Sequence, residues 1–261
     1  MNNKIETYND EELDFLRAGG RILSATHKHV EQHIRPGIST LELDQIAEQF
    51  ILSQNATPSF KGYSGYKFAT CISVNEEAIH CIPRSDKLLK EGDIVSIDIG
   101  VLYNGFCTDA ARTLPVGKIS QEAQQLINAT RQSFYEGIRG LKALSKVGDI
   151  GKRIEEFITS TTTFSLIEQY CGHGIGKNPH QPPMIPNYVP KTKEKKKLLQ
   201  SLNQRLPSGS VIAIEPMVNA GVKEVVLSED KWSTKTQDGR LSAHHENTVI
   251  ILEDGVEVIT E

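Results

Sequence analysis

The sequence lacks most features that mark secreted, membrane or nucleic-acid-binding proteins. It has only four cysteines in 261 residues and no C-x-x-C pair, which argues against a zinc ribbon or a disulfide framework. No apolar run approaches the roughly 18 residues of a membrane span, and residues 1–20 are charged and have no signal-peptide core. A net charge of −4 gives no reason to expect nucleic acid as the main ligand. We therefore expect a cytoplasmic protein with reduced thiols and with neither membrane nor DNA as a partner.

The first helix is predicted close to the start of the chain. It should begin at Asn9 or Asp10, which are common N-cap residues, and end before "RPGIST" at 35–40. Its apolar positions, which we expect to be buried, are Leu13, Leu16 and Leu23. The histidines of this segment have no acidic partners in view, so we expect them at the surface: His27, His29 and His33.

A second helix is indicated by a capping box, and the pattern returns later in the chain. Ser39 and Glu42 form an S-x-x-E box. It precedes an apolar stripe made of Leu43, Ile46, Ala47 and Phe50. A helix from about Ser120 to Leu144 is followed by "KVGDIGKRIEEFI". Its Ile154, Phe157 and Ile158 fall where Leu43, Ile46 and Ala47 fall when Gly37 is laid over Gly148. We expect one pseudo-symmetric domain over 1–261, with halves of about 1–118 and 119–261.

The one compositional break is "PKTKEKKKLLQSLNQRL" at 190–206, with five lysines between 191 and 197. We interpret this lysine-rich segment as a solvated surface insertion. The alternative is a local basic contact for RNA or the ribosome.

A hairpin is predicted to bring two carboxylates together on one face of the sheet. In "DIVSIDIGVLYNGFCTDAARTLPVG" the residues at 95, 97, 99 and 101 are apolar and form one strand face. Asn104-Gly105 is a strong hairpin signal, because both positions of a type I′ turn need positive φ. This turn pairs Gly100 with Asp109 and sets Asp98 diagonal to Asp109 on the other face, with Cα atoms about 7–8 Å apart. Such charges repel unless solvent or a cation lies between them, and we favour one or two divalent ions.

Three more residues can join these carboxylates. Glu215 ends the apolar run of "SVIAIEPMVNA", and Glu246 begins that of "HHENTVIILEDGVEVIT". A glutamate in such a run is costly unless it is paired or binds metal. His173 stands in the glycine-rich "YCGHGIG", where glycines permit the close approach of backbone or ligand. Four carboxylates and one imidazole are thus candidate metal ligands.

These segments resemble a known family. "IDIG…FCTDAA", "YCGHGIG", "AIEPM" and "ENTV" look like the metal-binding segments of the methionine aminopeptidases. "PGISTLELD", "GYSGYKFATCISVNEEAIHCIP", "LLKEGDIVSIDIG" and "KWSTKTQDGRLSA" look like its type I, bacterial-type enzymes, and the resemblance covers roughly residues 5 to 258. It implies an α+β pita-bread fold, a curved antiparallel sheet with flanking helices and internal pseudo-twofold symmetry.

The resemblance also implies the site and its chemistry. Two divalent ions (Mn, Fe, Co or Zn) would be held by Asp98, Asp109, His173, Glu215 and Glu246. Asp109 and Glu246 would bridge them, and the glycines would keep the approach to the His173 ring clear. A metal-bridging water or hydroxide would be the nucleophile and Glu215 the proton shuttle. Contacts that steady the substrate and the tetrahedral intermediate would come from His80 and His180.

By the same resemblance, the methionine side chain would lie among Tyr63, Tyr66, Cys71 and Trp232, next to His80 and His180. The expected activity is removal of methionine from the N-termini of peptides and nascent chains by a monomer. A ribosome contact through the lysine-rich segment would fit this activity.

Four positions depart from the family pattern, although none removes a ligand. Pro179 stands where bacterial members usually have a phenylalanine of the methionine pocket, and Asn247 where a histidine follows the ligand glutamate. Cys81 and Thr108 replace glycines beside His80 and Asp109. Altered surroundings of this kind can change metal binding, rate and preference.

Two other functions stay open. Proline dipeptidases and X-Pro aminopeptidases share the fold and the five-ligand set, but they usually carry an extra N-terminal domain, which we do not expect here. Residues 62–71 also favour the methionine branch. A divergent, non-catalytic relative that binds RNA or the ribosome should have lost ligands, whereas all five are present.

Overall fold

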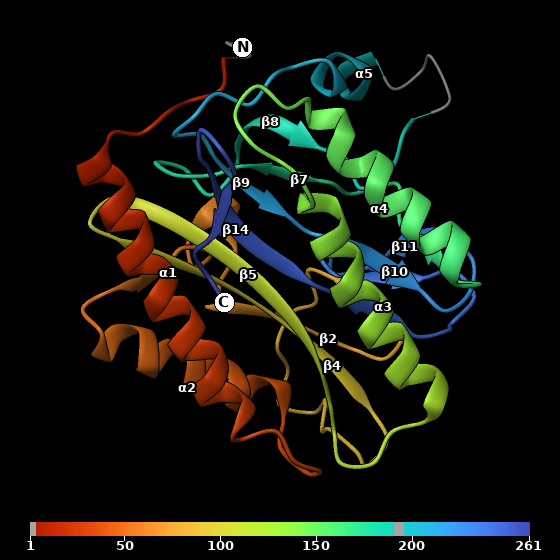
Figure 1. Ribbon diagram of the computed structural model, residues 1–261. Helices are drawn as coiled ribbons and strands as arrows, with labels where there is room; N and C mark the ends of the chain where they lie inside the picture. The colour runs from red at the N-terminus through yellow and green to blue at the C-terminus, as the bar shows by residue number, and fades with distance from the viewer. Residues whose placement is uncertain (1–3, 191–195) are drawn as a thin grey trace.

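The computed structural model describes residues 4–190 and 196–261. In it, helices pack against antiparallel strands (Figure 1). The helices are α1 (Asp10–Glu31), α2 (Thr40–Ser53), the 3-10 turn η1 (Tyr63–Gly65), α3 (Gln121–Ile138), α4 (Val147–Thr161) and α5 (Lys196–Leu202). Residues 191–195 of the lysine-rich segment lie outside the described residues, so its role stays a prediction. In the described ranges, no helix combines the length and the apolar character that crossing a membrane requires.

The largest sheet in the described ranges has nine strands, and all of its pairings are antiparallel. Its main path runs β1 (Thr57–Pro58), β4 (Ile94–Tyr103), β5 (Phe106–Pro115), β14 (Glu246–Ile251), β9 (Val211–Ile214), β7 (Gly172–Gly174) and β8 (Gln181–Ile185). Off this path, β2 (Thr70–Val74) pairs with β4, and β15 (Val256–Val258) pairs with β14.

Two three-stranded sheets accompany it in the part of the chain that the structure describes. One is β13 (Ser242–His244), β10 (Met217–Asn219) and β6 (Ser165–Leu166), and the other is β11 (Val225–Leu227), β12 (Thr234–Thr236) and β3 (Glu77–Ile79). Helices beside antiparallel sheets confirm the predicted α+β class.

Local capping signals predicted the helix starts well, but one helix end was wrong. Asn9 with Glu12, and Ser39 with Glu42, form reciprocal capping boxes at the starts of α1 and α2. The helix expected to reach Leu144 ends at Ile138. Gly140 has φ +68°, a left-handed conformation that commonly closes a helix.

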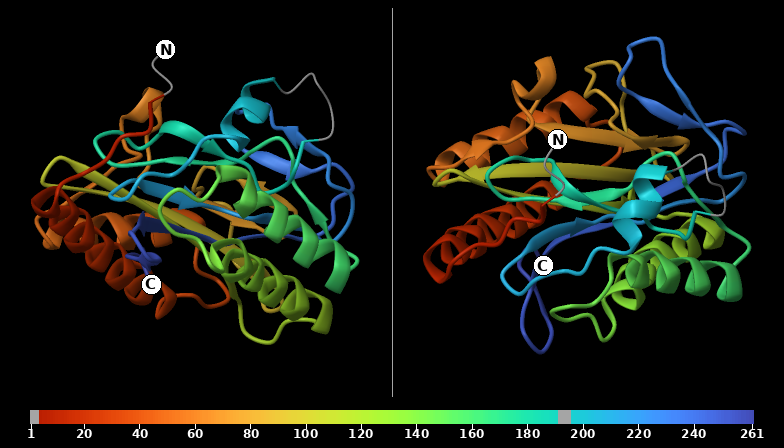
Figure 2. Two further views of the ribbon diagram at one scale, coloured as in Figure 1. Left: turned by 45° about the horizontal axis from the view of Figure 1, so that its top comes forward. Right: turned by 90° about the horizontal axis from the view of Figure 1, so that it is seen from above.

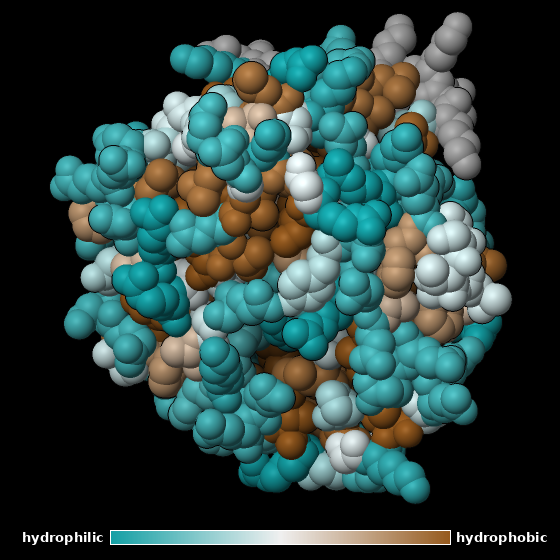
Figure 3. Space-filling view, in the orientation of Figure 1, coloured by the Kyte–Doolittle hydropathy of each residue, from teal (hydrophilic) through white to brown (hydrophobic). Residues whose placement is uncertain are grey.

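The apolar face of β4 packs under the first two helices, as the alternation predicted. Leu23 of α1 and Leu43 of α2 belong to one buried cluster with the strand positions Val95, Ile97, Ile99 and Val101. A second cluster joins α3 and α4 to β9 and β14. Helices α1, α3 and α4 lie on the same side of the sheet (Figure 2). The face of the molecule shown in Figure 3 is mostly hydrophilic, and its apolar residues are exposed mainly between α1 and α3.

One expectation for α1 was wrong, because His27 is buried rather than at the surface. It is 7% exposed, and its Nε2 lies 2.9 Å from the carbonyl oxygen of Ala110 on β5. Position 27 falls on the same helix stripe as Leu23 and Val30, four residues after one and three before the other, so it turns toward the sheet. His29 and His33 are half-buried.

Candidate metal centre

The β4–β5 hairpin has the predicted register and brings two aspartates to one place. Asn104 and Gly105 have φ values of 47° and 84°, as a type I′ turn requires. Tyr103 then pairs with Phe106, and Gly100 with Asp109. Asp98 and Asp109 are 7% and 3% exposed and line the same cavity. The pairing predicted from the turn is therefore confirmed.

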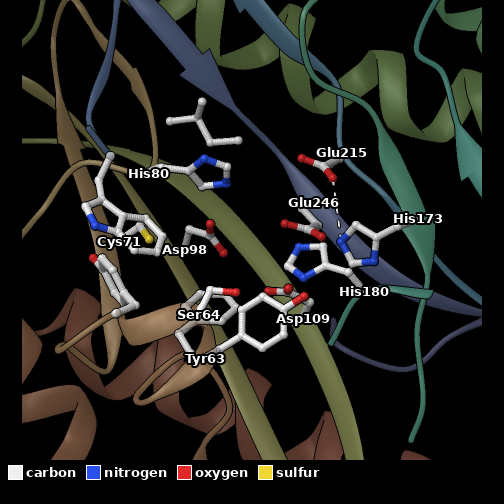
Figure 4. Close-up of a pocket in the computed structure, with 14 residues that line it drawn as sticks. Tyr63, Ser64, Cys71, His80, Asp98, Asp109, His173, His180, Glu215 and Glu246 are labelled. Carbon is white, nitrogen blue, oxygen red and sulfur yellow. Dashed lines mark ion pairs between the residues drawn. The ribbon is translucent and has the colours of Figure 1, made fainter. Parts of the chain in front are cut away.

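The order of the strands brings the other predicted ligands alongside. Strands β5, β14, β9 and β7 are consecutive neighbours. Asp109 lies on β5, Glu246 begins β14, Glu215 directly follows β9, and His173 is the middle residue of β7. Neighbouring strands lie about 4.8 Å apart, so four residues distant in the sequence meet in one row. Figure 4 shows the carboxylates and the His173 ring converging.

His173 presents one ring nitrogen to this cluster. Its Nδ1 lies 3.0 Å from the carbonyl oxygen of Gly174. A carbonyl only accepts hydrogen bonds, so Nδ1 carries the proton and Nε2 keeps its lone pair. Nε2 lies 3.7 Å from Oε1 of Glu215, the contact dashed in Figure 4. The imidazole is thus oriented as a metal-binding histidine should be.

The glycines beside His173 let neighbouring backbone approach closely. A Cβ atom on Gly172 would lie 2.3 Å from the carbonyl oxygen of Ala213, and one on Gly174 would lie 2.2 Å from that of Pro182. These carbonyls belong to the neighbouring strands β9 and β8. The glycines therefore allow close packing of β7 between its neighbours, and the expectation that they also keep the approach to the ring clear stays a prediction.

Several buried polar atoms of this cluster have no hydrogen-bond partner within the described ranges. They are Asp98 Oδ1, Asp109 Oδ1, Glu246 Oε1 and His244 Nε2. Buried polar atoms are normally hydrogen-bonded, so such a concentration indicates a cation-binding site. Among the residues that the structure describes, two groups of three each place one donor atom per residue within 4.8 Å of one another: Asp98, His244 and Glu246, and Asp109, His173 and Glu246. These donor sets fit divalent metal ions.

The electrostatics of the carboxylates lead to the same conclusion. Burial, followed by the charge of Glu215, raises the pKa of Asp98 to about 7. Burial, followed by neighbouring carboxylates, raises the pKa values of Asp109 and Glu246 well above their ordinary range. For Glu215 burial also acts upward, but the nearby imidazoles outweigh it, and the pKa of that carboxyl is lowered. A cation among them would favour the ionised form of all four carboxylates.

A cavity of about 190 Å³ opens beside the carboxylates. It is lined by every site residue predicted from the sequence, namely Tyr63, Tyr66, Cys71, His80, Asp98, Asp109, His173, His180, Glu215, Trp232 and Glu246, and also by Phe60, Ser64 and Ile79. Typical ligand pockets are roughly 300–1,000 Å³, so this one suits a ligand about the size of one residue. Tyr66 and Trp232 pack with ring centroids 4.9 Å apart in its apolar wall, which includes the Cys71 thiol.

Two further histidines flank the carboxylates. The His180 ring lies 4.3 Å from that of His173 and 5.3 Å from that of Tyr63, which is 40% exposed at the cavity mouth. His80 has φ +59°, a sparsely populated conformation that is common at functional sites. Burial lowers the pKa values of His80 and His180 to about 4. Both imidazoles are therefore neutral at pH 7.

His244 was missed in the sequence, although a signal was present. It contacts both Glu215 and Glu246, with Nε2–Oε2 distances of 3.6 and 3.7 Å. It precedes Glu246 by two residues in "HHENTV", and in extended chain residues two apart share a face. That alternation could have placed His244 beside the carboxylates.

Two departures from the family pattern lie away from this cavity. Pro179 lines a different hollow, together with Tyr63 and Lys177. The Asn247 side chain bonds away from the ligands. Its Oδ1 accepts hydrogen bonds from Arg112 Nη2 (2.6 Å) and Thr260 Oγ1 (2.9 Å). Neither residue is among those that line the cavity.

The chain is similar to known metallopeptidases over nearly its whole length. The model of metallopeptidase family M24 matches residues 14–253. Methionine aminopeptidase 1 of Bacillus subtilis (strain 168) is 45% identical over 95% of this chain and 96% of its own length. Methionine aminopeptidase of Clostridium perfringens is 46% identical over 97% of each chain.

Solved structures agree with this similarity. Methionine aminopeptidase from Thermotoga maritima matches with a TM-score of 0.92 and 36% identity, over 99% of this chain and 100% of that one. Prolidase from Pyrococcus furiosus matches with a TM-score of 0.77 and 20% identity, over 98% of this chain and 65% of that one. At such identity, the second likeness shows the fold alone.

Proposed function

The chain belongs to metallopeptidase family M24 and has its pita-bread fold, and on that premise we propose that it is a methionine aminopeptidase. It removes methionine by hydrolysis from the N-termini of peptides and nascent chains and depends on divalent metal ions. The observation that carries the proposal is the buried row of carboxylates with unbonded oxygens that opens onto a cavity of single-residue size.

Two ions fit the donor atoms. The two groups of three share Glu246, and Asp109 lies beside Asp98 across the hairpin. We assign Asp98, Asp109, His173, Glu215 and Glu246 as the residues that would hold the ions. Bound ions would polarise the scissile carbonyl and lower the pKa of a water molecule into the neutral range. Oxygen donors with imidazole suit Mn, Fe, Co or Zn, and availability decides among them.

The protein's own groups supply the proton transfers and the alignment of the substrate. Glu215, with its lowered pKa, is ionised at neutral pH and can accept the proton of the attacking water and return it to the leaving amine. His80 and His180 are neutral and can each donate one N–H to the substrate amide or carbonyl. Donors aimed at the developing charge stabilise the tetrahedral intermediate.

The cavity wall explains a preference for methionine. Tyr66, Cys71 and Trp232 offer an apolar, polarizable surface that suits an unbranched thioether. Tyr63 and His180 pack together at the mouth. The small volume of the cavity favours one side chain over an extended peptide. The rest of the bound substrate would therefore extend out of the cavity past Tyr63.

The test begins with protein stripped of metal by a chelator. Mn²⁺, Fe²⁺, Co²⁺ or Zn²⁺ is added back separately, and free methionine released from Met-Ala-Ser is measured. Met-Leu and X-Pro peptides run beside it, as does the Asp109→Asn variant. Metal-dependent methionine release that the variant lacks is expected and would rank the ions.

Other outcomes point elsewhere. Release from X-Pro peptides alone would indicate a proline dipeptidase or X-Pro aminopeptidase. The identity to prolidase, 20%, is lower than the 36% identity to the methionine aminopeptidase structure. No release with any ion, despite bound metal, would favour a binding protein. The cytoplasmic location, the monomeric state, the ribosome contact and the division into two halves stay predictions.

A further inference from the structure

His244 is a buried imidazole that contacts the ligand cluster, although it is not among the residues that line the cavity. It ends β13 and is 1% exposed. Both of its backbone groups bond to Thr113 of β5: the N–H donates to Oγ1 and the carbonyl accepts from it, each at 2.8 Å. The main chain is thus fixed, which holds the ring in place. Nε2 is buried and has no hydrogen-bond partner in residues 4–190 and 196–261.

The distances from His244 Nε2 to the nearest carboxylate oxygens suit an ion that these groups would bind together. Its Nε2 lies 3.6 Å from Oε2 of Glu215 and 3.7 Å from Oε2 of Glu246, beyond hydrogen-bond range. An ion with nitrogen and oxygen ligands at about 2.0–2.2 Å holds neighbouring donors roughly 3–3.7 Å apart. His173 Nε2 lies 3.7 Å from the other oxygen of Glu215. The two imidazoles therefore flank Glu215 at matching separations.

The two histidines also fall into different donor groups. One group contains His244 with Asp98 and Glu246, and the other contains His173 with Asp109 and Glu246. The ligand set inferred from the family pattern has a single imidazole, at 173. We propose that His244 is a second nitrogen ligand of the metal centre, on the ion beside Asp98. This rests on the proposed function only in requiring bound metal, and not on the identity of the peptide substrate.

A second imidazole changes which ions the centre favours. The Asp98 side would otherwise offer oxygen donors alone, which suit Mn²⁺. Imidazole suits Zn²⁺ and Fe²⁺ better, so His244 would shift the preference of this half of the centre toward them. An imidazole binds a metal ion through an unprotonated ring nitrogen.

The experiment uses full-length protein stripped with a chelator and reloaded with two equivalents of Co²⁺. X-ray absorption fine structure counts imidazole ligands per cobalt, and calorimetry gives the affinity of each site. The variants are His244→Gln and His173→Gln. The matched control is His245→Gln, a neighbouring buried histidine whose Nε2 lies 3.3 Å from Asn247 Nδ2, away from the cluster.

Wild type should show two imidazoles for every two cobalt ions, and each of the two variants should show one. His244→Gln should weaken one site about ten- to hundredfold, whereas His245→Gln should match wild type. If wild type shows a single imidazole ligand and His173→Gln shows none, the proposal is overturned. This outcome does not depend on whether His244→Gln folds. Absence of any cobalt binding would instead overturn the proposed function. Methionine release, followed on the same samples, separates the two.

Discussion

Nε2 of His173 lies 3.7 Å from Oε1 of Glu215, across the adjacent strands β7 and β9. Burial is the main cause that lowers the pKa of His173, so the contact joins a neutral imidazole to a carboxylate and is not an ion pair. It is also too long for a hydrogen bond. Both atoms are held ready for a third group between them, and this arrangement leads to the first prediction.

Metal binding should stabilise the protein, because the buried carboxylates repel each other without a cation. At a concentration about 100 times Kd, an ion adds about 2.7 kcal/mol, or roughly 5–10 °C in Tm for a chain of this size. Calorimetric scans with chelator and with Co²⁺ measure the shift. Asp109→Asn should reduce it, whereas the control Asp86→Asn, 86% exposed in its side chain, should not. Equal Tm values in wild type with and without metal would contradict the prediction.

Removing either neutral histidine should slow the reaction without loss of metal. His80→Ala and His180→Ala are each expected to lower kcat about 10²- to 10³-fold, since each removes a donor to the developing charge. Steady-state rates on Met-Ala-Ser and metal analysis of the same samples test this. His29→Ala on α1 is the control. A variant that also loses its metal would show instead that the ring supports the centre.

Narrowing the cavity at Cys71 should weaken substrate binding. Cys71→Val replaces the thiol with one methyl group and adds a second beside a cavity of about 190 Å³. We expect KM for Met-Ala-Ser to rise roughly tenfold with little change in kcat, as for lost uniform binding. Cys107→Val, at a buried thiol of another apolar cluster, is the matched control. An unchanged KM in Cys71→Val would mean that the methionine side chain lies elsewhere.

Asn247 should matter for stability rather than for catalysis. Its Oδ1 accepts from the half-buried Arg112 guanidinium and from Thr260. Asn247→Ala removes both acceptor contacts, and a hydrogen bond to a charged group contributes about 1.5–3 kcal/mol. Urea unfolding should show a loss of that size with metal content unchanged, whereas Asn128→Ala, exposed on α3, should show little. Loss of metal with unchanged stability would reverse this interpretation.

Buried His27 should make the fold sensitive to acid. Burial lowers its pKa from 6.5 to about 3. Between these values the unfolded chain binds a proton that the native state does not, so the free energy of unfolding falls as pH falls from about 6.5 toward 3. One such proton contributes about 1.4 kcal/mol per pH unit.

Urea titrations from pH 7.5 to 5 would measure this slope. His27→Gln should reduce it by up to one proton, whatever its effect on stability at pH 7.5. His29→Gln, with a half-buried ring on the same helix, is the control for a lost histidine. The prediction fails if wild type and His27→Gln have the same slope.

Features set by short stretches of chain were predictable. The Asn104-Gly105 turn determines its own register, because two residues with positive φ leave few other pairings. The capping boxes at Ser39 and Asn9 depend on side chains three residues apart. The end of α3 was misjudged because an apolar pattern continues past Gly140, where only the backbone conformation turns the chain.

The sequence by itself determined which residue types could form the site and how the hairpin aims Asp98 and Asp109. Only the tertiary structure decided which strands became neighbours. The order β5–β14–β9–β7 depends on how apolar faces from the whole chain pack together, and it sets Glu246, Glu215 and His173 beside Asp109. That packing also buried His27 and turned His244 toward the carboxylates. It set carbonyl groups of the neighbouring strands against the glycines around His173. Such contacts join residues far apart in the chain, so no local pattern of spacing or propensity specifies them.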